Sequence, residues 1–230
     1  QRVALEGAAV VIGARRESVG NEVAAEIRAI GGRAIFATTD VRQEPEPGSL
    51  VRLAMTRFRR LDGAFNNAGD VEVTGPLSDI DARVWEEELT RNLTSVFYCL
   101  KAEIPAILEG GLGGSVVNNA SIGGTVGIAG MSPYVAAKHG VVGLTRCAAL
   151  EHAEQGLRVN ALVTGNVDTP LYRRLAGTSL DAGVELPAPN PTGRVANPDE
   201  IAAFVAFLLS DEAAFITGAA LAIDGGFTAQ

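Results

Sequence analysis

A tyrosine and a lysine four residues apart, Tyr134 and Lys138, open a segment with helical spacing. Residues at i and i+4 share one face of a helix, so the ammonium of Lys138 can lie near the phenol of Tyr134. A neighbouring cation favours the phenolate of a tyrosine, whose ordinary pKa is about 10. The pair could therefore move a proton near neutral pH, although the same spacing also joins a surface tyrosine and lysine on ordinary helices.

Two further polar residues fall where they can join this pair. Ser121 lies just past an apolar run, and a glycine-rich segment separates it from Tyr134. Asn92 lies in the middle of a predicted helix, where an amide is a poor helix former. Ser121 alone could be a turn former at a strand end, and Asn92 could bend its helix. Both of these roles are compatible with a place in a site.

The elements that must position these residues follow from hydrophobic patterning. Short apolar runs alternate with amphipathic stretches, which predicts repeated β-α-β units, a parallel sheet covered by helices on both sides and one domain over residues 1–230. The expected fold is a doubly wound α/β arrangement of three layers. Strands are expected at 8–13, 34–37, 61–65, 116–118, 157–163 and 219–223, and helices at 18–30, 49–58, 81–108, 133–153 and 198–209, the last capped by Asn197.

Composition excludes several classes of protein. The 230 residues are 47% hydrophobic and 20% charged, with a net charge of −8 and no basic stripe, so nucleic acid is not an expected partner. The longest apolar runs are too short to span a membrane. With only two cysteines, Cys99 and Cys147, we expect a reducing, cytoplasmic setting. His139 and His152 lack metal-like partners and are interpreted as packing or surface residues.

Polar and glycine residues collect where the predicted strands end. In an open parallel sheet, ligands bind outside the carboxyl ends of the strands, so these residues predict a site at one edge. They are Arg15 and Arg16, then Asp40 and Val41, then Asn66 to Gly69, then Asn119 to Ser121, and finally Thr164 to Asn166.

Taken together, these pieces resemble the short-chain dehydrogenase/reductase family, in its single-domain Rossmann branch. The resemblance runs in the family's order from about residue 8 to the C-terminus. It implies an oxidoreductase that interconverts a small ketone and a secondary alcohol with a nicotinamide cofactor, usually as a homotetramer (or homodimer). The matching segments are Asp40-Val41, Asn66 to Gly69, Asn92-Leu93, Ser121, Tyr134 with Lys138, Asn160-Ala161, Val167 to Pro170, Ile216 to Gly218, and Asp224 to Gly226.

The resemblance also implies a role for each matching residue. Tyr134 would be the catalytic acid/base, Lys138 would lower its pKa and hold the nicotinamide ribose, and Ser121 would bind the substrate oxygen. Asn92 would anchor a water that links Lys138 to solvent. The remaining implied cofactor contacts are Asp40 and Val41 beside the adenine, Asn67, Ala68 and Gly69 supporting the cofactor side of the sheet, and Gly165, Val167 and Thr169 near the nicotinamide.

The residues after the first predicted strand favour one cofactor. An acidic residue there binds the ribose hydroxyls of NAD, whereas arginine accommodates the 2′-phosphate of NADP. This chain has Ala14-Arg15-Arg16, which predicts NADP(H), with NAD(H) possible. Two other functions stay open: an NAD-dependent alcohol dehydrogenase, and a non-catalytic cofactor-sensing protein on the same fold.

Two departures from the family pattern affect these expectations. The family's central strand and its glycine-rich turn have no counterpart here, so the strands at 8–13 and 61–65 are expected to have unpaired edges. Gln1 is accordingly expected to lie within the fold, with about 25 residues preceding it. Thr164-Gly165 replaces the usual Pro-Gly. Residues 171–193 are expected to form the substrate-loop region.

Overall fold

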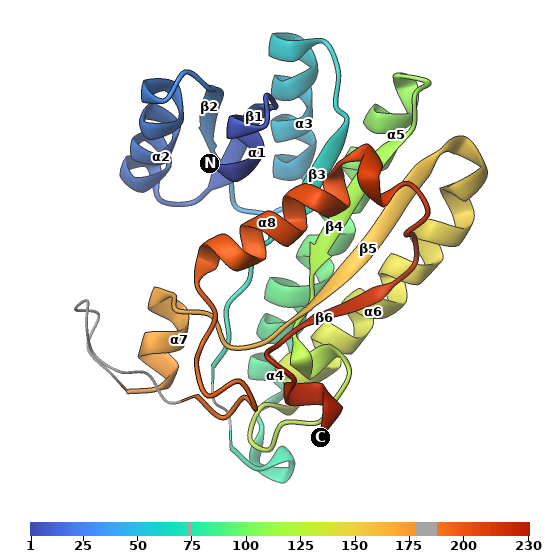
Figure 1. The fold of residues 1–230 in the computed structure, drawn as a ribbon. Coiled ribbons are helices and arrows are strands. Elements are labelled where there is room, and N and C mark those ends of the chain that lie inside the picture. The colour runs from blue at the N-terminus through green and yellow to red at the C-terminus, as the bar shows by residue number, and fades with distance from the viewer. Residues whose placement is uncertain (73–74, 178–187) are drawn as a thin grey trace.

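All six predicted strands are present in the computed structural model, which describes residues 1–72, 75–177 and 188–230 (Figure 1). Their ends differ from the predicted ones by at most two residues, and every pair is parallel. The strands are β1 (Ala9–Ala14), β2 (Arg33–Thr38), β3 (Gly63–Asn66), β4 (Gly114–Asn119), β5 (Leu157–Thr164) and β6 (Ala220–Ile223).

The helices cover both faces of these strands, which confirms the doubly wound, three-layer α/β prediction. Buried clusters place α1 (Arg2–Leu5), α2 (Glu17–Ala29) and α8 (Pro198–Leu209) on one face. The other face carries α3 (Pro45–Phe58), α5 (Ser95–Glu109) and α6 (Ser132–His152). Helix α8 begins as predicted, because the side chain of Asn197 accepts from the backbone of Asp199 and Glu200 completes a capping box.

The helix predicted over 81–108 is divided in the structure. Helix α4 (Ala82–Leu89) is followed by a π-helical turn, Thr90–Thr94, before α5 begins. Asn92 lies at the centre of that turn, so the helix departs from regular α-helical geometry at this residue. Helix α7 (Pro170–Leu175) was not predicted; Thr169 caps its first turn by accepting from the backbone N–H of Tyr172 at 3.2 Å.

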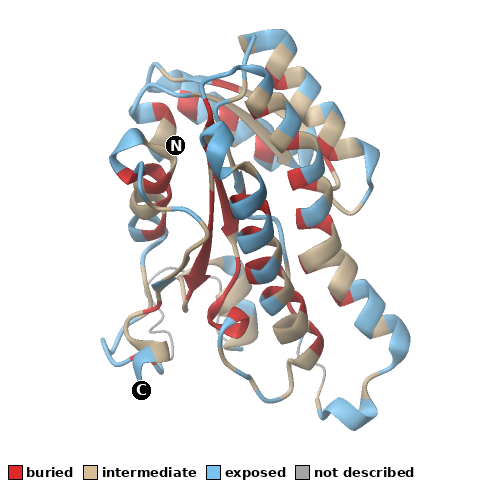
Figure 2. Ribbon diagram, turned by 90° about the vertical axis from the view of Figure 1, so that its right-hand side faces the viewer, coloured by how far each residue is buried: buried red, intermediate tan, exposed pale blue. Residues whose placement is uncertain are grey.

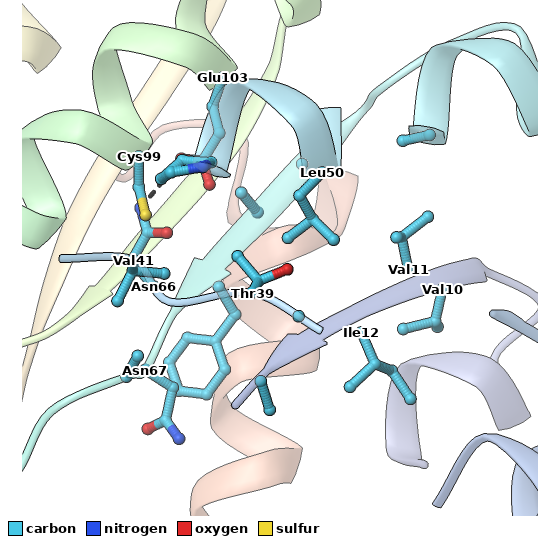
Figure 3. A pocket seen from close by; sticks show the side chains of 18 of the residues that line it. Val10, Val11, Ile12, Thr39, Val41, Leu50, Asn66, Asn67, Cys99 and Glu103 are labelled. Carbon is cyan, nitrogen blue, oxygen red and sulfur yellow. Dashed lines mark hydrogen bonds between the residues drawn. The ribbon is translucent and has the colours of Figure 1, made fainter. Parts of the chain in front are cut away.

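The sheet is interrupted between β1 and β3. Strand β1 pairs only with β2, while β3, β4, β5 and β6 form a separate four-stranded sheet. A cavity of about 1410 Å³ lies between the facing edges, and side chains of β1, α3 and α5 line it (Figure 3). The break separates the two strands for which unpaired edges were expected.

The interruption changes the burial of the first strand. Residues of β4 and β5 are nearly all buried, and the red strands at the centre of Figure 2 mark this core. The residues of strand β1 are at most half-buried, because one edge of this strand borders the cavity. None of the described helices is both long and apolar enough to cross a membrane.

Candidate active site

The predicted pair of hydroxyls is brought together by the end of β4 and the start of α6. Ser121 caps a short 3-10 turn, Ile122–Gly124, by accepting from the backbone N–H of Gly123 at 3.1 Å. Tyr134 lies in the first turn of α6, close enough to Ser121 for the serine side chain to lower the pKa of the phenol. Two residues thirteen positions apart therefore present adjacent hydroxyl groups.

Lys138 lies one turn further along α6, as its spacing from Tyr134 predicted. Its side chain is buried, at 4% exposure, and Nζ donates to the backbone oxygen of Asn119 at 2.8 Å. Nζ is also 5.6 Å from the centroid of the Tyr134 ring. Burial lowers the pKa of Lys138 to about 8, because a charged ammonium is poorly solvated there.

The structure differs from the expectation that Lys138 lowers the pKa of Tyr134. Burial raises this pKa above its ordinary value, because the phenolate loses more solvation than its neighbours restore. The nearby side chain of Ser121 acts in the opposite direction, while the negative charges of Glu88 and Asp70 add to the increase. In the described structure, Tyr134 is thus held in its protonated form.

Asn92 approaches the same group from the π-helical turn. It is fully buried, and its Nδ2 donates to Oε2 of Glu88 at 2.8 Å while its Oδ1 accepts from the backbone N–H of Asp70 at 3.3 Å. The loop after β3 packs closely here: a Cβ added to Gly69 would lie 2.8 Å from Oδ1 of Asn92 and 3.6 Å from Nζ of Lys138. Gly69 therefore permits the approach of Asn92 and Lys138.

The ends of three strands are joined by amide and hydroxyl side chains. Asn119 Nδ2 donates to Oδ1 of Asn67 at 2.8 Å, and Oγ1 of Thr164 donates to Oδ1 of Asn119 at 2.6 Å. Thr164 thus contributes a bond from its side chain at the position where the family usually has proline. The adjacent Gly165 leaves room for β6, because a Cβ there would lie 2.6 Å from Cα of Asp224.

The predicted cofactor residues fall into two groups. One group lines the cavity between β1 and β3 and comprises Arg15, Arg16, Asp40, Val41, Asn67, Ala68 and Gly69. The other group lies beyond the lining of that cavity and comprises Tyr134, Lys138, Gly165, Val167 and Thr169. Gly69 lies between the two groups of residues, since it lines the cavity and also lies next to Asn92 and Lys138.

Asp40 forms a salt bridge, whereas Arg15 and Arg16 do not form one within the described residues. The carboxylate of Asp40 holds Arg42 through two parallel hydrogen bonds, which lowers the pKa of Asp40, and Arg15 lowers it further. In contrast, neither Arg15 nor Arg16 forms a salt bridge within the described residues. Two unpaired guanidinium groups consequently border the cavity.

Comparison with known proteins assigns the chain. A family model described as "Enoyl-(Acyl carrier protein) reductase" matches residues 1–228. Similar curated proteins include 2,5-dichloro-2,5-cyclohexadiene-1,4-diol dehydrogenase of Sphingobium indicum, 43% identical over 97% of this chain and 88% of that protein. The chain belongs to the short-chain dehydrogenase/reductase family.

Further members of the short-chain dehydrogenase/reductase family agree with this assignment. Cyclohexanol dehydrogenase of an Acinetobacter species is 39% identical over 99% of this chain and 88% of that protein. The crystal structure of levodione reductase has a TM-score of 0.91 at 36% identity, covering 99% of this chain and 91% of the other. Carveol dehydrogenase from Mycobacterium avium, solved in complex with NAD, has a TM-score of 0.90 at 29% identity, covering 100% and 91%. The chain is accordingly an NAD(P)-dependent oxidoreductase with a Rossmann-like fold.

Two buried carboxylates were missed by the sequence reasoning for this short-chain dehydrogenase/reductase. Glu88 contacts Asn92, as described above, and Glu103 accepts from Nδ2 of Asn66 at 2.9 Å. Burial raises the pKa of Glu103 to about 7. The spacing of Glu88 and Asn92 by four residues was a usable signal, but two neighbouring glutamates in the same helix obscured it.

The expected substrate-loop region is described only in part. Helix α7 occupies its beginning, Arg173 pairs with Asp168 at 2.6 Å, and Val167 bridges to Ala196. Residues 178–187 lie outside the described part of the chain. The hydroxyl of Thr169 is already used to cap α7.

Proposed function

We propose that this short-chain dehydrogenase/reductase interconverts a carbocyclic ketone and its secondary alcohol, with Tyr134 as acid/base and NADP(H) as cofactor. The observation that carries the proposal is the placement of Ser121 and Tyr134 close together, beside the buried ammonium of Lys138. The ring substrate is suggested by two relatives whose names specify a cyclohexanol and a cyclohexadienediol.

The surroundings of Tyr134, Ser121 and Lys138 support a separate role in the reaction for each of them. Tyr134, kept protonated by burial, is suited to donate its proton to the carbonyl oxygen as an alkoxide develops. Ser121 offers a second hydroxyl to the same oxygen. Lys138 donates a hydrogen bond to the backbone of Asn119. Its pKa of about 8 is close enough to physiological pH for the ammonium to release and regain a proton. When bound, the nicotinamide donates or accepts the hydride.

The residues bordering the cavity fit a phosphorylated ribose. Arg15 and Arg16 have no salt-bridge partner in the described residues, and guanidinium groups bind phosphate in two-point geometry. The carboxylate of Asp40 is engaged by Arg42 and lies one strand away. These observations support NADP(H), whereas the related carveol dehydrogenase was solved with NAD.

Turnover by a tyrosine variant tests the catalytic proposal. Tyr134→Phe removes the proton donor, and kcat for reduction of a panel of cyclohexanones is expected to fall by about 10²–10⁴-fold. Tyr98→Phe, on α5, is the matched control and is expected to keep wild-type kcat. A non-catalytic sensor would bind cofactor but show no turnover in either protein. Equal kcat in wild type and Tyr134→Phe would contradict the assigned role.

Michaelis constants test the cofactor proposal separately. Arg15→Ala and Arg16→Ala are expected to raise the KM for NADPH about tenfold or more each and to change the KM for NADH little. Arg57→Ala, an exposed arginine on α3, serves as the control for net charge. A KM for NADH equal to or below that for NADPH in the wild type would favour the NAD-dependent alternative.

A further inference from the structure

A buried carboxylate lies directly behind Asn92. Glu88 is 1% exposed; its Oε2 accepts from Nδ2 of Asn92 at 2.8 Å and its Oε1 accepts from Arg91 at 2.9 Å. Removing a carboxylate from water is costly unless hydrogen bonds replace the lost solvation. Both of its side-chain partners come from the π-helical turn, so Glu88 is tied to the local geometry of that turn.

The two ends of an asparagine amide are different, and a carboxylate selects between them. An ionised carboxylate only accepts hydrogen bonds, whereas an amide has a donating nitrogen and an accepting oxygen. The nitrogen of Asn92 must therefore face Glu88, which turns Oδ1 toward the backbone N–H of Asp70, next to Gly69. A flipped amide would set Oδ1 against the carboxylate and leave the N–H of Asp70 facing another donor.

We propose that Glu88 is a positioning residue of the oxidoreductase site, fixing the amide of Asn92 so that its oxygen faces the backbone N–H of Asp70, next to Gly69. The inference rests on the proposed function for the reaction served, but the orientation itself follows from the contacts. Glu88 acts through Asn92 and through its charge, and it does not touch the hydroxyls of the site.

The charge of Glu88 reaches the titrating groups of α6. It raises the pKa of both Tyr134 and Lys138, because a nearby negative charge disfavours the phenolate and favours the ammonium. Burial raises the pKa of Glu88 itself, and Arg91 opposes that increase. The other charged groups around this cluster are Glu72, which pairs with Arg91, and Asp70, which pairs with Arg174.

Two substitutions separate the hydrogen bond from the charge. Glu88→Gln keeps an oxygen that accepts from Asn92 but removes the charge, while Glu88→Leu removes both. Glu86→Gln, an exposed glutamate on α4, is the matched control. Arg91 keeps Glu72 as a partner in every variant. Circular dichroism and thermal unfolding identify the variants that fold.

Steady-state kinetics across pH give the first readout. In alcohol oxidation, the acidic limb of kcat/KM is expected to move to lower pH in Glu88→Gln, since Tyr134 then loses its proton more readily. Its maximal kcat is expected to stay within about threefold of wild type. Glu88→Leu is expected to show the same movement and a kcat about ten- to hundredfold lower, the usual cost of releasing a positioned group.

A second readout needs no turnover. The sequence contains only two lysines, Lys101 and Lys138, so protein carrying ¹³C-labelled lysine gives two side-chain signals. Lys138 is expected to titrate near its pKa of about 8 in wild type and Glu86→Gln, and at lower pH in Glu88→Gln. The exposed Lys101 is the internal reference.

The outcomes distinguish the two proposals. Wild type without turnover on any ketone, but with the expected movement of the Lys138 signal, would refute the proposed function and retain the electrostatic coupling to Glu88. An unchanged Lys138 titration in Glu88→Gln would overturn that coupling. A folded Glu88→Leu with wild-type kcat would overturn the positioning role.

Discussion

The close packing of Gly69 yields a prediction whose size follows from the structure. An alanine there would place Cβ 2.8 Å from Oδ1 of Asn92, closer than real Cβ contacts. Gly69 does not have a positive φ, so the strain comes from this contact rather than from the backbone. Asn92 is fully buried and held by Glu88, which leaves it little room to retreat. Overpacking of this kind costs about 1–3 kcal/mol.

Urea unfolding and steady-state kinetics measure the two expected effects of Gly69→Ala. The free energy of unfolding should fall by that amount, and kcat should fall about ten- to hundredfold because Asn92 and Lys138 are displaced. Gly143→Ala in α6 is the control; a Cβ there meets nothing within 4 Å, and a helical alanine should stabilise by about 0.5–1 kcal/mol.

A double variant isolates the contact itself. Adding Asn92→Ala removes the oxygen that the new methyl group meets, so Gly69→Ala should cost much less stability in that background than in wild type. The reasoning is refuted if Gly69→Ala unfolds at the same urea concentration as wild type and retains its kcat. It is also refuted if the stability loss is unchanged in the Asn92→Ala background.

Two further predictions concern buried charges. Glu103→Gln should stabilise the protein by about 3 kcal/mol above pH 7 and should not stabilise it at pH 4. The reason is that the pKa of Glu103 is about 7 in the folded protein, so ionising this buried carboxyl lowers the free energy of unfolding as pH rises from 4.5. Equal stability of variant and wild type at pH 8 would contradict this. Lys138→Met should be inactive yet about 1–2 kcal/mol more stable at pH 7, since relief of a penalty of about 3 kcal/mol exceeds the loss of the bond to Asn119. The penalty is full below pH 8 and disappears by about pH 10.5, so the gain should shrink above pH 8 and become a net loss of stability by pH 10.5, as measured by urea unfolding at several pH values.

The positions of the strands along the chain were predictable because each parallel strand is an apolar run bounded by polar or glycine residues. Strands β4 and β5 show this most clearly, since helices cover both of their faces. The π-helical turn at Thr90–Thr94 was not predictable in detail, because its extra residue per turn leaves no mark on the local apolar pattern. Helix α7 is shorter than two turns, so its periodicity was also too brief to read.

The site was predictable as far as it rests on local spacing or on the shared edge of the sheet. The approach of Tyr134 and Lys138 follows from one helical turn, and Ser121 follows from the end of β4. The direction of the pKa of Tyr134 could not be read, because it depends on solvation by every element packed around the phenol. The same holds for Glu88, whose burial distinguishes it from the exposed glutamates before it only after α4 has packed.

The break in the sheet divides the proposed functions between two structural units. Ser121, Tyr134 and Lys138 depend on β4 and α6, which belong to the continuous core around the four-stranded sheet. Arg15 and Arg16 instead follow β1, across the cavity, where the apolar packing is a smaller separate cluster. The residues proposed for proton transfer and those proposed for phosphate binding therefore rest on different hydrophobic clusters, with Gly69 lying next to both groups. Changes in the packing of β1 should act on the affinity for cofactor, whereas changes behind β4 and α6 should act on kcat.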